Sequence, residues 1–253
     1  MNEQFSGKVA LVTGGSGGIG RATALLFASR GAKVVIASRS AEESAKTVAL
    51  IAEAGGTAHF VQTDVTSEKQ VERLIKEVVG KFGRLDFAFN NAGAQPVPSA
   101  TTEQTEEDWD HMLAVNLKGT WLCMKYELRE MLKQRRGAIV NNASISGLVG
   151  IATWPAQCAS KHGVVGLTRA VAIEHAKSGI RVNVVCPGAI ETDMLKGLTR
   201  GNPEFEAAVA AAEPMGRVGK PEEVAEAVVW LCADSSSFVT GHALAVDGGW
   251  VAQ

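Results

Sequence analysis

The sequence predicts an α/β fold in which one doubly wound parallel β-sheet is covered by helices on both faces. Short segments that are almost continuously apolar alternate with longer amphipathic segments along the chain, which is typical of successive βαβ units. The short segments show little polar alternation, as expected of strands that are buried on both faces. No segment resembles a linker or a repeat. We therefore expect residues 1–253 to form a single domain.

Seven segments have the pattern of buried strands. Each is mainly apolar and ends at a glycine, a serine or an aspartate. In chain order, the expected strands are Lys8–Gly14, Ala32–Ser38, Thr57–Asp64, Leu85–Gly93, Gly137–Ser144, Ile180–Gly188 and His242–Gly249.

Six longer segments between these strands have the pattern of helices. Pro221 stands at the first position of the last one, and Gly31 follows the end of the first, where these residue types favour helix ends. Residues 190–213 are longer than an ordinary connection and carry a short helical pattern, which predicts a mobile lid. In chain order, the expected helices are Gly18–Arg30, Ser40–Ala54, Ser67–Phe82, Glu103–Lys133, Pro155–Lys177 and Pro221–Ala233.

The composition narrows the class of partner. A net charge of −2 without a block of basic residues argues against a nucleic acid or a membrane surface. The chain has no apolar stretch of membrane-spanning length and no signal-peptide pattern, so we expect a cytoplasmic protein that binds a small molecule. Its four cysteines are far apart, without a CxxC pair or a histidine cluster. Neither a disulfide framework nor a metal site is expected.

A glycine-rich turn, TGGSGGIG, follows the first expected strand. Gly14, Gly18 and Gly20 allow a sharp turn and leave room for a phosphate to approach the backbone. The helix that begins in this turn offers free N–H groups and a partial positive charge to an anion. Because the turn joins a strand to a helix, it predicts a dinucleotide-binding site.

The end of the second expected strand bears on which dinucleotide is bound. A site that selects NAD usually places a carboxylate there, to hold the ribose 2′-hydroxyl. Here the residues are Ser38 and Arg39, which favour a 2′-phosphate and therefore NADP(H); a solvated arginine is the alternative. Asp64, at the end of the third strand, either accepts a hydrogen bond from the adenine amino group or caps the helix that begins near Thr66, or does both.

Further motifs occur in order along the chain. They are Asn90-Asn91-Ala92-Gly93, Asn116 in AVNLKG, Ser144 at the end of NNAS, Ala159-Ser160-Lys161, Pro187-Gly188 with Thr192, and Val246–Gly249 in VDGG. With the glycine-rich turn, they make the sequence resemble the classical short-chain dehydrogenase/reductase family over its whole length. The resemblance implies a Rossmann-type sheet of seven strands, a nicotinamide cofactor and commonly a homotetramer.

The resemblance also implies positions for the cofactor. In the family, the residue equivalent to Asn90 and the glycine after it shape the cofactor cleft, and residues 187–192 lie beside the nicotinamide. The expected cofactor-binding residues are Gly14, Ser16, Gly18, Ile19, Gly20, Ser38, Arg39, Asp64, Val65, Asn91, Ala92, Gly93, Lys161, Pro187, Gly188, Ile190 and Thr192.

Four positions carry the family's acid–base chemistry. The resemblance implies that Asn116 anchors a water chain, that Ser144 donates to the substrate oxygen and that Lys161 holds the ribose. The family's proton-exchanging tyrosine would stand four residues before Lys161, where this chain has Gln157. The only tyrosine, Tyr126, lies in the long expected helix, where nothing places it near the cleft.

A glutamine changes what the site can do. Gln157 and Lys161 are one helical turn apart and face the same way, but a carboxamide donates hydrogen bonds without titrating. Since a general acid contributes roughly 10² to 10⁴ in rate, ordinary ketone reduction should be slow. Three hypotheses follow: a working oxidoreductase whose substrate, such as an iminium ion, needs no phenolic proton; an inactivated or re-engineered carbonyl reductase; or a non-catalytic NADP-binding protein.

Several apolar residues suggest a hydrophobic substrate pocket, with Leu195 and Met215 near the expected lid. Trp154 would reshape this pocket, or else pack at the start of its helix. The helices 103–133 and 155–177 carry apolar surface on more than one face, which is consistent with an oligomer. The expected pocket residues are Ser146, Val149, Trp154 and Met194.

Overall fold

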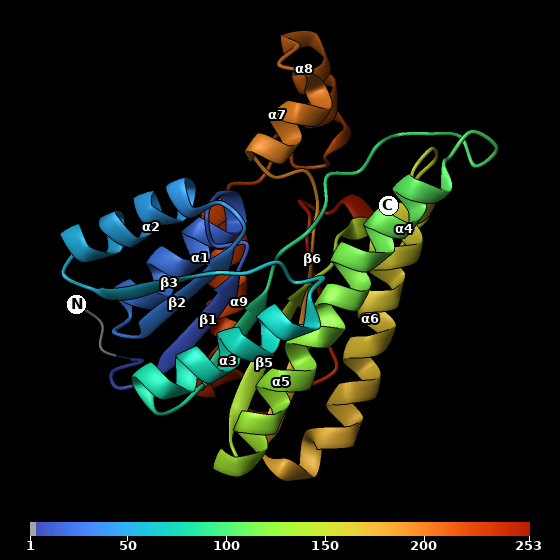
Figure 1. Cartoon of the computed structure of the whole chain (residues 1–253). Coiled ribbons are helices and arrows are strands. Elements are labelled where there is room, and N and C mark those ends of the chain that lie inside the picture. The colour runs from blue at the N-terminus through green and yellow to red at the C-terminus, as the bar shows by residue number, and fades with distance from the viewer. Residues whose placement is uncertain (1–3) are drawn as a thin grey trace.

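A seven-stranded parallel sheet forms the centre of the protein, in the strand order β3-β2-β1-β4-β5-β6-β7 (Figure 1). The computed structural model describes residues 4–253. The predicted doubly wound α/β fold is confirmed. The strands are β1 (Val9–Thr13), β2 (Lys33–Ser38), β3 (Thr57–Gln62), β4 (Phe87–Asn90), β5 (Gly137–Asn142), β6 (Ile180–Pro187) and β7 (Ala243–Val246).

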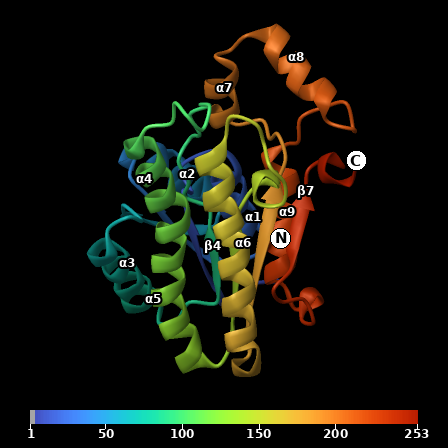
Figure 2. The same cartoon turned by 90° about the vertical axis from the view of Figure 1, so that its right-hand side faces the viewer.

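Helices lie on both sides of the sheet (Figure 2). One face is covered by α3, α5 and α6, and the other by α1, α2 and α9. Two further helices, α7 and α8, lie beyond the carboxyl end of β6. The helices are α1 (Gly18–Ser29), α2 (Ala41–Glu53), α3 (Glu68–Phe82), α4 (Glu106–Leu113), α5 (Gly119–Gln134), α6 (Pro155–His175), α7 (Asp193–Thr199), α8 (Pro203–Ala212) and α9 (Pro221–Cys232).

The long helix predicted from Glu103 to Lys133 is wrong at its start and in its middle. The helical segment begins at Glu106, because the Thr105 side chain accepts a hydrogen bond from the Asp108 N–H at 3.1 Å and caps the first turn. Ala114–Lys118 then forms a π-helical turn between α4 and α5. Such turns often occur at functional sites, and this one contains Asn116.

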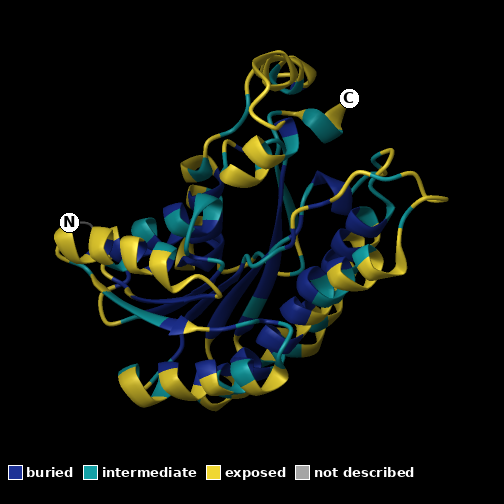
Figure 3. Ribbon diagram, turned by 45° about the horizontal axis from the view of Figure 1, so that its top comes forward, coloured by how far each residue is buried: buried dark blue, intermediate teal, exposed yellow. Residues whose placement is uncertain are grey.

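Alternating residues of each central strand fill two separate cores. In β1, Leu11 packs with α3 and α5, whereas Ala10 and Val12 pack with α1 and α9. All three are fully buried, as expected of a parallel sheet between two helical layers. Figure 3 shows this burial in the dark strands and in the inward faces of the helices.

The strand order reverses direction between β1 and β4. Both strands run parallel, and Thr13 of β1 lies beside Asn90 of β4 at their carboxyl ends. The connections from these two strands leave on opposite sides of the sheet, which opens a crevice between them. Any ligand of this sheet is expected to bind at this edge.

A carboxyl group is buried below that edge. Glu127 of α5 is fully buried, and its Oε2 accepts a hydrogen bond from Asn90 Nδ2 at 3.0 Å. Asn90 Nδ2 also donates to Asn141 Oδ1 at 3.0 Å, while Glu127 Oε1 and Asn90 Oδ1 have no partner. Burial raises the pKa of Glu127 to about 8, despite the hydrogen bond from Asn90. Asn90, which the resemblance places at the cofactor cleft, is instead buried in this network.

We predict that Glu127 makes the stability of the protein depend on pH. The folded state keeps a proton that the unfolded state releases above its ordinary pKa of 4.5. The free energy of unfolding should therefore fall as the pH rises from 4.5 to about 8, by up to about 1.4 kcal/mol per pH unit from this group. Urea unfolding of Glu127→Gln, which keeps an acceptor for Asn90, should lack this slope.

Glu130→Gln is the matched control, because Glu130 lies on the same helix and pairs with Lys133 near the surface. Its unfolding curve should keep the slope of the unmodified chain. Equal pH dependence in Glu127→Gln and the unmodified chain would contradict the prediction.

Candidate active site

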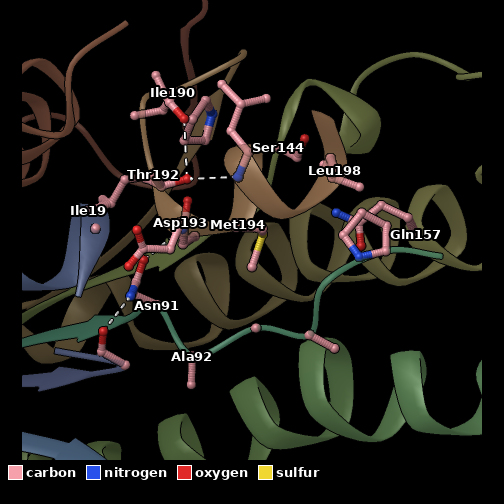
Figure 4. Close-up of a pocket in the computed structure, with 18 of the residues that line it drawn as sticks. Ile19, Asn91, Ala92, Ser144, Gln157, Ile190, Thr192, Asp193, Met194 and Leu198 are labelled. Carbon is pink, nitrogen blue, oxygen red and sulfur yellow. Dashed lines mark hydrogen bonds between the residues drawn. The ribbon is translucent and has the colours of Figure 1, made fainter. Parts of the chain in front are cut away.

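A cavity of about 690 Å³ opens at the carboxyl ends of the strands. Its walls come from the loops after β1, β2, β3, β4, β5 and β6, from the start of α6, and from α7 and α8. In Figure 4, Ile19 and Asn91 lie at one end of the pocket, and Gln157 lies at the other, with Met194 between them. The cavity thus joins the glycine-rich turn to the residues expected to carry the chemistry.

The glycine-rich turn presents backbone to the cavity. Gly14 and Gly18 have φ of +65° and +49°, a left-handed conformation that favours glycine. A Cβ on Gly18 would lie 3.0 Å from Thr192 Cγ2, so the turn packs directly on the loop after β6. The first turn of α1 has no acidic residue and no side-chain cap, so its free N–H groups can bind an anion.

Asn91 ties the loops after β1, β4 and β5 together. The Asn91 and Ala92 N–H groups donate to Thr13 Oγ1 at 3.0 and 3.1 Å. Asn91 Nδ2 donates to the carbonyls of Thr13 and Gly14 at 3.2 Å, and its Oδ1 accepts from Asn142 Nδ2 at 2.9 Å. These bonds pair backbone and side-chain groups where three loops cross, although Asn142 Oδ1 has no partner there.

The far end of the cavity is formed by the loops after β2 and β3. The Ser38 hydroxyl is shared with Ser44 Oγ at 2.7 Å and with the Ser40 carbonyl at 3.1 Å, so protein groups already occupy it. Arg39 is exposed and lines the cavity wall. Its charge and five N–H donors suit a phosphate.

Asp64 faces the same end of the cavity. Its Oδ1 accepts from the Thr66 N–H at 2.9 Å and from the Thr66 hydroxyl at 2.8 Å. Burial raises the pKa of Asp64, but the Thr66 hydrogen bonds and the positive charge of Arg39 outweigh burial, and the pKa is lowered. Asp64 thus holds the turn at Thr66, but the prediction that it caps the helix is wrong, because Ser67 is the N-cap residue of α3.

Gln157 and Lys161 lie one turn apart on α6, and both line the cavity. Lys161 is buried, with an exposed fraction of 6%, and its Nζ donates to the Asn142 carbonyl at 2.8 Å. Burial lowers the pKa of Lys161 to about 8. Ser144 also lines the cavity, and its Oγ accepts from the Ser146 N–H at 3.2 Å.

Asn116 reaches the site only through another side chain. It is buried and does not line the cavity, and its Nδ2 donates directly to Gln157 Oε1 at 3.0 Å. Asn116 is therefore joined to Gln157 by a direct contact between two carboxamides, and the water chain from Asn116 stays a prediction.

Two expected pocket residues do line the cavity. Met194 lies on α7, and Trp154 immediately precedes α6. Thr153 before it has φ of +64°, and its carbonyl accepts from the Ser99 N–H at 2.8 Å. A β-branched residue in this conformation is a strained backbone. Trp154 therefore both begins the helix and forms the pocket wall.

Other expected site residues do not line the cavity. Ser146 is wrong as a pocket residue, because it is fully buried in a 3₁₀ turn. Val149 is partly buried behind the wall, and Met215 is 69% exposed outside it. Gly20 is wrong as a lining residue, because it packs against the Gly14 carbonyl beneath the turn.

The structure also supplies pocket residues that the sequence analysis missed. Pro96 lies in the loop after β4, Leu198 lies on α7, and Trp250 follows the VDGG motif. In the sequence, the only sign that these residues line the pocket was that they lie close to recognised motifs. Further large apolar additions are Val115, Ile145, Ile151, Phe205 and Val209.

Tyr126 lies outside the cavity. Its hydroxyl donates to Glu68 Oε1 at 3.0 Å, between α5 and α3. Within residues 4–253, no three His, Cys, Asp or Glu side chains are grouped to hold a metal ion. None of the helices in the described part of the chain has both the length and the apolar character to cross a membrane.

A family model and close relatives match the chain. The model described as "Enoyl-(Acyl carrier protein) reductase" matches residues 14–251. A cis-4-hydroxycyclohexanecarboxylate dehydrogenase of Sinomonas cyclohexanicum is 44% identical over 253 residues, which cover 100% of both chains. A 2,5-dichloro-2,5-cyclohexadiene-1,4-diol dehydrogenase of Sphingobium indicum is 41% identical over 249 residues, which cover 98% of each chain.

A solved structure is similar as well. A crystal structure of an actinorhodin polyketide ketoreductase with NADPH matches with a TM-score of 0.94 and 38% identity, and the match covers 99% of each chain.

We predict that two glycines of the turn differ sharply in their tolerance of alanine. A Cβ on Gly20 would collide with the Gly14 carbonyl, whereas a Cβ on Gly17 would meet nothing within 4 Å. Gly20→Ala should therefore lower stability by about 1–3 kcal/mol, and Gly17→Ala should leave it nearly unchanged. Thermal unfolding without any ligand measures both, and equal melting temperatures for the two variants would contradict the prediction.

Proposed function

The chain belongs to the short-chain dehydrogenase/reductase family of oxidoreductases, and we propose that it uses NADP(H) to act on a C=O/CH–OH or C=N group of a small, mainly apolar substrate. The observation that carries this proposal is a single cavity. It joins the glycine-rich turn and Arg39 to Gln157, Lys161 and an apolar wall.

The residues at the turn fit a dinucleotide. A pyrophosphate would meet the free N–H groups of the first turn of α1 without an acidic side chain nearby. At the other end, Arg39 would hold a 2′-phosphate, while the Ser38 hydroxyl is engaged elsewhere. The similar ketoreductase structure with NADPH supports the phosphorylated cofactor. When bound, the nicotinamide exchanges a hydride with the reacting carbon.

The remaining part of the cavity suits a small apolar substrate. Trp154, Met194 and Leu198 form its walls, together with Phe205 and Val209 of the second lid helix. We assign residues 190–213 as the lid, because both helices of this segment line the cavity. Relatives named as dehydrogenases of alcohols on six-membered carbon rings support a ring-shaped substrate.

We place Gln157 at the position of the family's tyrosine. Its carboxamide binds the substrate but cannot give up a proton. Ser144 would donate a second hydrogen bond, and we assign the proton for a ketone to the Lys161 ammonium, delivered through solvent. Reduction then adds one hydride to carbon and one proton to oxygen, leaving Lys161 neutral until solvent reprotonates it. Since the pKa of Lys161 is about 8, this donor is lost as the pH rises above that value.

The exposed apolar residues of α4, α5 and α6 support a homotetramer. Trp109, Trp121 and Ile173 are 38, 44 and 80% exposed on these helices, and a second subunit would bury them. A monomeric mass in solution would exclude this assembly.

We predict that Gln157→Tyr raises ketone reduction by about 10²-fold or more, because a phenol beside Lys161 restores a positioned acid. The assay follows NADPH consumption with cyclohexanone and with a cyclic imine. Gln157→Phe is the control, since it supplies the ring without the hydroxyl and should show no gain.

Three outcomes would contradict this proposal. If folded Gln157→Tyr binds NADPH but gains no ketone activity, position 157 is not the position of the acid. If the unmodified chain reduces ketones rapidly, and neither Gln157 nor Lys161 matters, another group supplies the proton. Tight NADPH binding without turnover of either substrate would favour a non-catalytic protein.

We predict that Arg39→Asp reverses the cofactor preference. Replacing a phosphate-binding cation by a carboxylate should weaken NADPH binding by about 10- to 100-fold and leave NADH binding similar or better. Cofactor fluorescence titration measures both dissociation constants. Arg129→Asp makes the same charge change at Arg129, which lies over the Tyr126 ring outside the cavity, and should change neither constant.

A further inference from the structure

The orientation of one buried carboxamide is fixed by the backbone. Asn116 lies in the π-helical turn, is 1% exposed, and has an amide oxygen, Oδ1, that accepts from the Ala94 N–H at 2.9 Å. A backbone N–H can only donate, so the Asn116 atom that faces it must be the oxygen. The Asn116 nitrogen therefore faces the other way, toward α6.

The next two contacts agree with this direction. Asn116 Nδ2 donates to Gln157 Oε1 at 3.0 Å and to Ser160 Oγ at 3.1 Å, and it also lies 2.8 Å from Met112 Sδ, a weak acceptor. Ser160 Oγ uses its own proton to donate to the Gln157 backbone carbonyl at 2.9 Å, which leaves its lone pairs for Asn116. Every donor in this series of hydrogen bonds thus meets an acceptor.

The same series of hydrogen bonds determines which end of the Gln157 carboxamide faces the cavity. Because Oε1 is turned inward to Asn116, the Nε2 group is turned outward. In residues 4–253 no protein atom accepts from Nε2, and it is not among the fully buried unpaired atoms. Gln157 therefore presents two N–H donors, and no acceptor, to the substrate region.

We propose that Asn116 is a positioning residue that holds Gln157 as a hydrogen-bond donor, so that the site selects substrates by an acceptor atom. This inference rests on the proposed function. The substrate class is narrowed to molecules with an acceptor atom at the reacting carbon, which is a carbonyl oxygen, the hydroxyl oxygen of the corresponding alcohol or a neutral imine nitrogen. An iminium N–H, which is a donor, finds no acceptor at Gln157, so the iminium hypothesis is disfavoured.

The test exchanges donor for acceptor at position 116. Asn116→Asp has no N–H; one carboxylate oxygen keeps the Ala94 bond, and the other faces Gln157. The Gln157 carboxamide should then rotate, placing Nε2 on the aspartate and Oε1 in the cavity. Two neutral five-membered rings report this change: cyclopentanone, which only accepts, and pyrrole, whose N–H only donates.

Dissociation constants for both rings are measured by NMR titration with oxidised NADP bound, so that cyclopentanone cannot be reduced. The unmodified chain should bind cyclopentanone about tenfold more tightly than pyrrole. In Asn116→Asp this ratio should reverse. In a Gln157→Leu background, Asn116→Asp should leave the ratio unchanged, which separates positioning from a general effect of the added charge.

Two results would overturn the proposal. One is an unchanged ratio in folded Asn116→Asp, and the other is a preference of the unmodified chain for pyrrole, which tests the orientation even if the variant does not fold. Failure of NADP to bind the unmodified chain, measured on the same samples, would instead overturn the proposed function; the two rings would then be compared without cofactor.

Discussion

The structure depends on the joint between the carboxyl ends of β1 and β4. Thr13 Oγ1 accepts hydrogen bonds from two consecutive backbone N–H groups after β4, and Asn91 returns bonds to the carbonyls after β1. These bonds hold the loops after β1 and β4 at a fixed separation. They are needed because the two strands have ended there and the sheet makes no further hydrogen bonds between them. The glycine-rich turn, the loop after β5 and the start of α7 are all positioned against this joint.

Burial on both faces of the sheet sets the electrostatics. Polar groups between the layers have no access to water, so each must be paired or must change its protonation. The same desolvation acts in opposite directions on Glu127 and Lys161, whose pKa values both approach 8. One group keeps its proton in the interior, and the other becomes able to release one at the cavity wall.

The sequence was sufficient for the fold and for the position of each strand, because hydrophobic periodicity and glycine placement act locally. The predicted ends run up to three residues past the observed ones, as at Gly93 after β4 and Gly249 after β7. Local geometry also located the cavity residues. The end of a strand places Arg39, and a single helical turn places Gln157 and Lys161 on the same side of their helix. Ser146 and Asn90 could not be placed, because a 3₁₀ turn and a buried carboxylate from α5 decide where they point. The contact between Asn116 and Gln157 joins residues 41 positions apart, and the π-helical turn that permits it has no clear sequence pattern.

The left-handed Thr153 couples the shape of the pocket to folding energy. A residue of this type in that conformation costs about 1–3 kcal/mol, and the Ser99 N–H bond to its carbonyl offsets part of that cost. A glycine at position 153 would adopt the same backbone conformation at lower energy, but it would also allow other conformations. Thr153→Gly would therefore remove this strain and at the same time loosen the segment that holds Trp154 at the cavity wall.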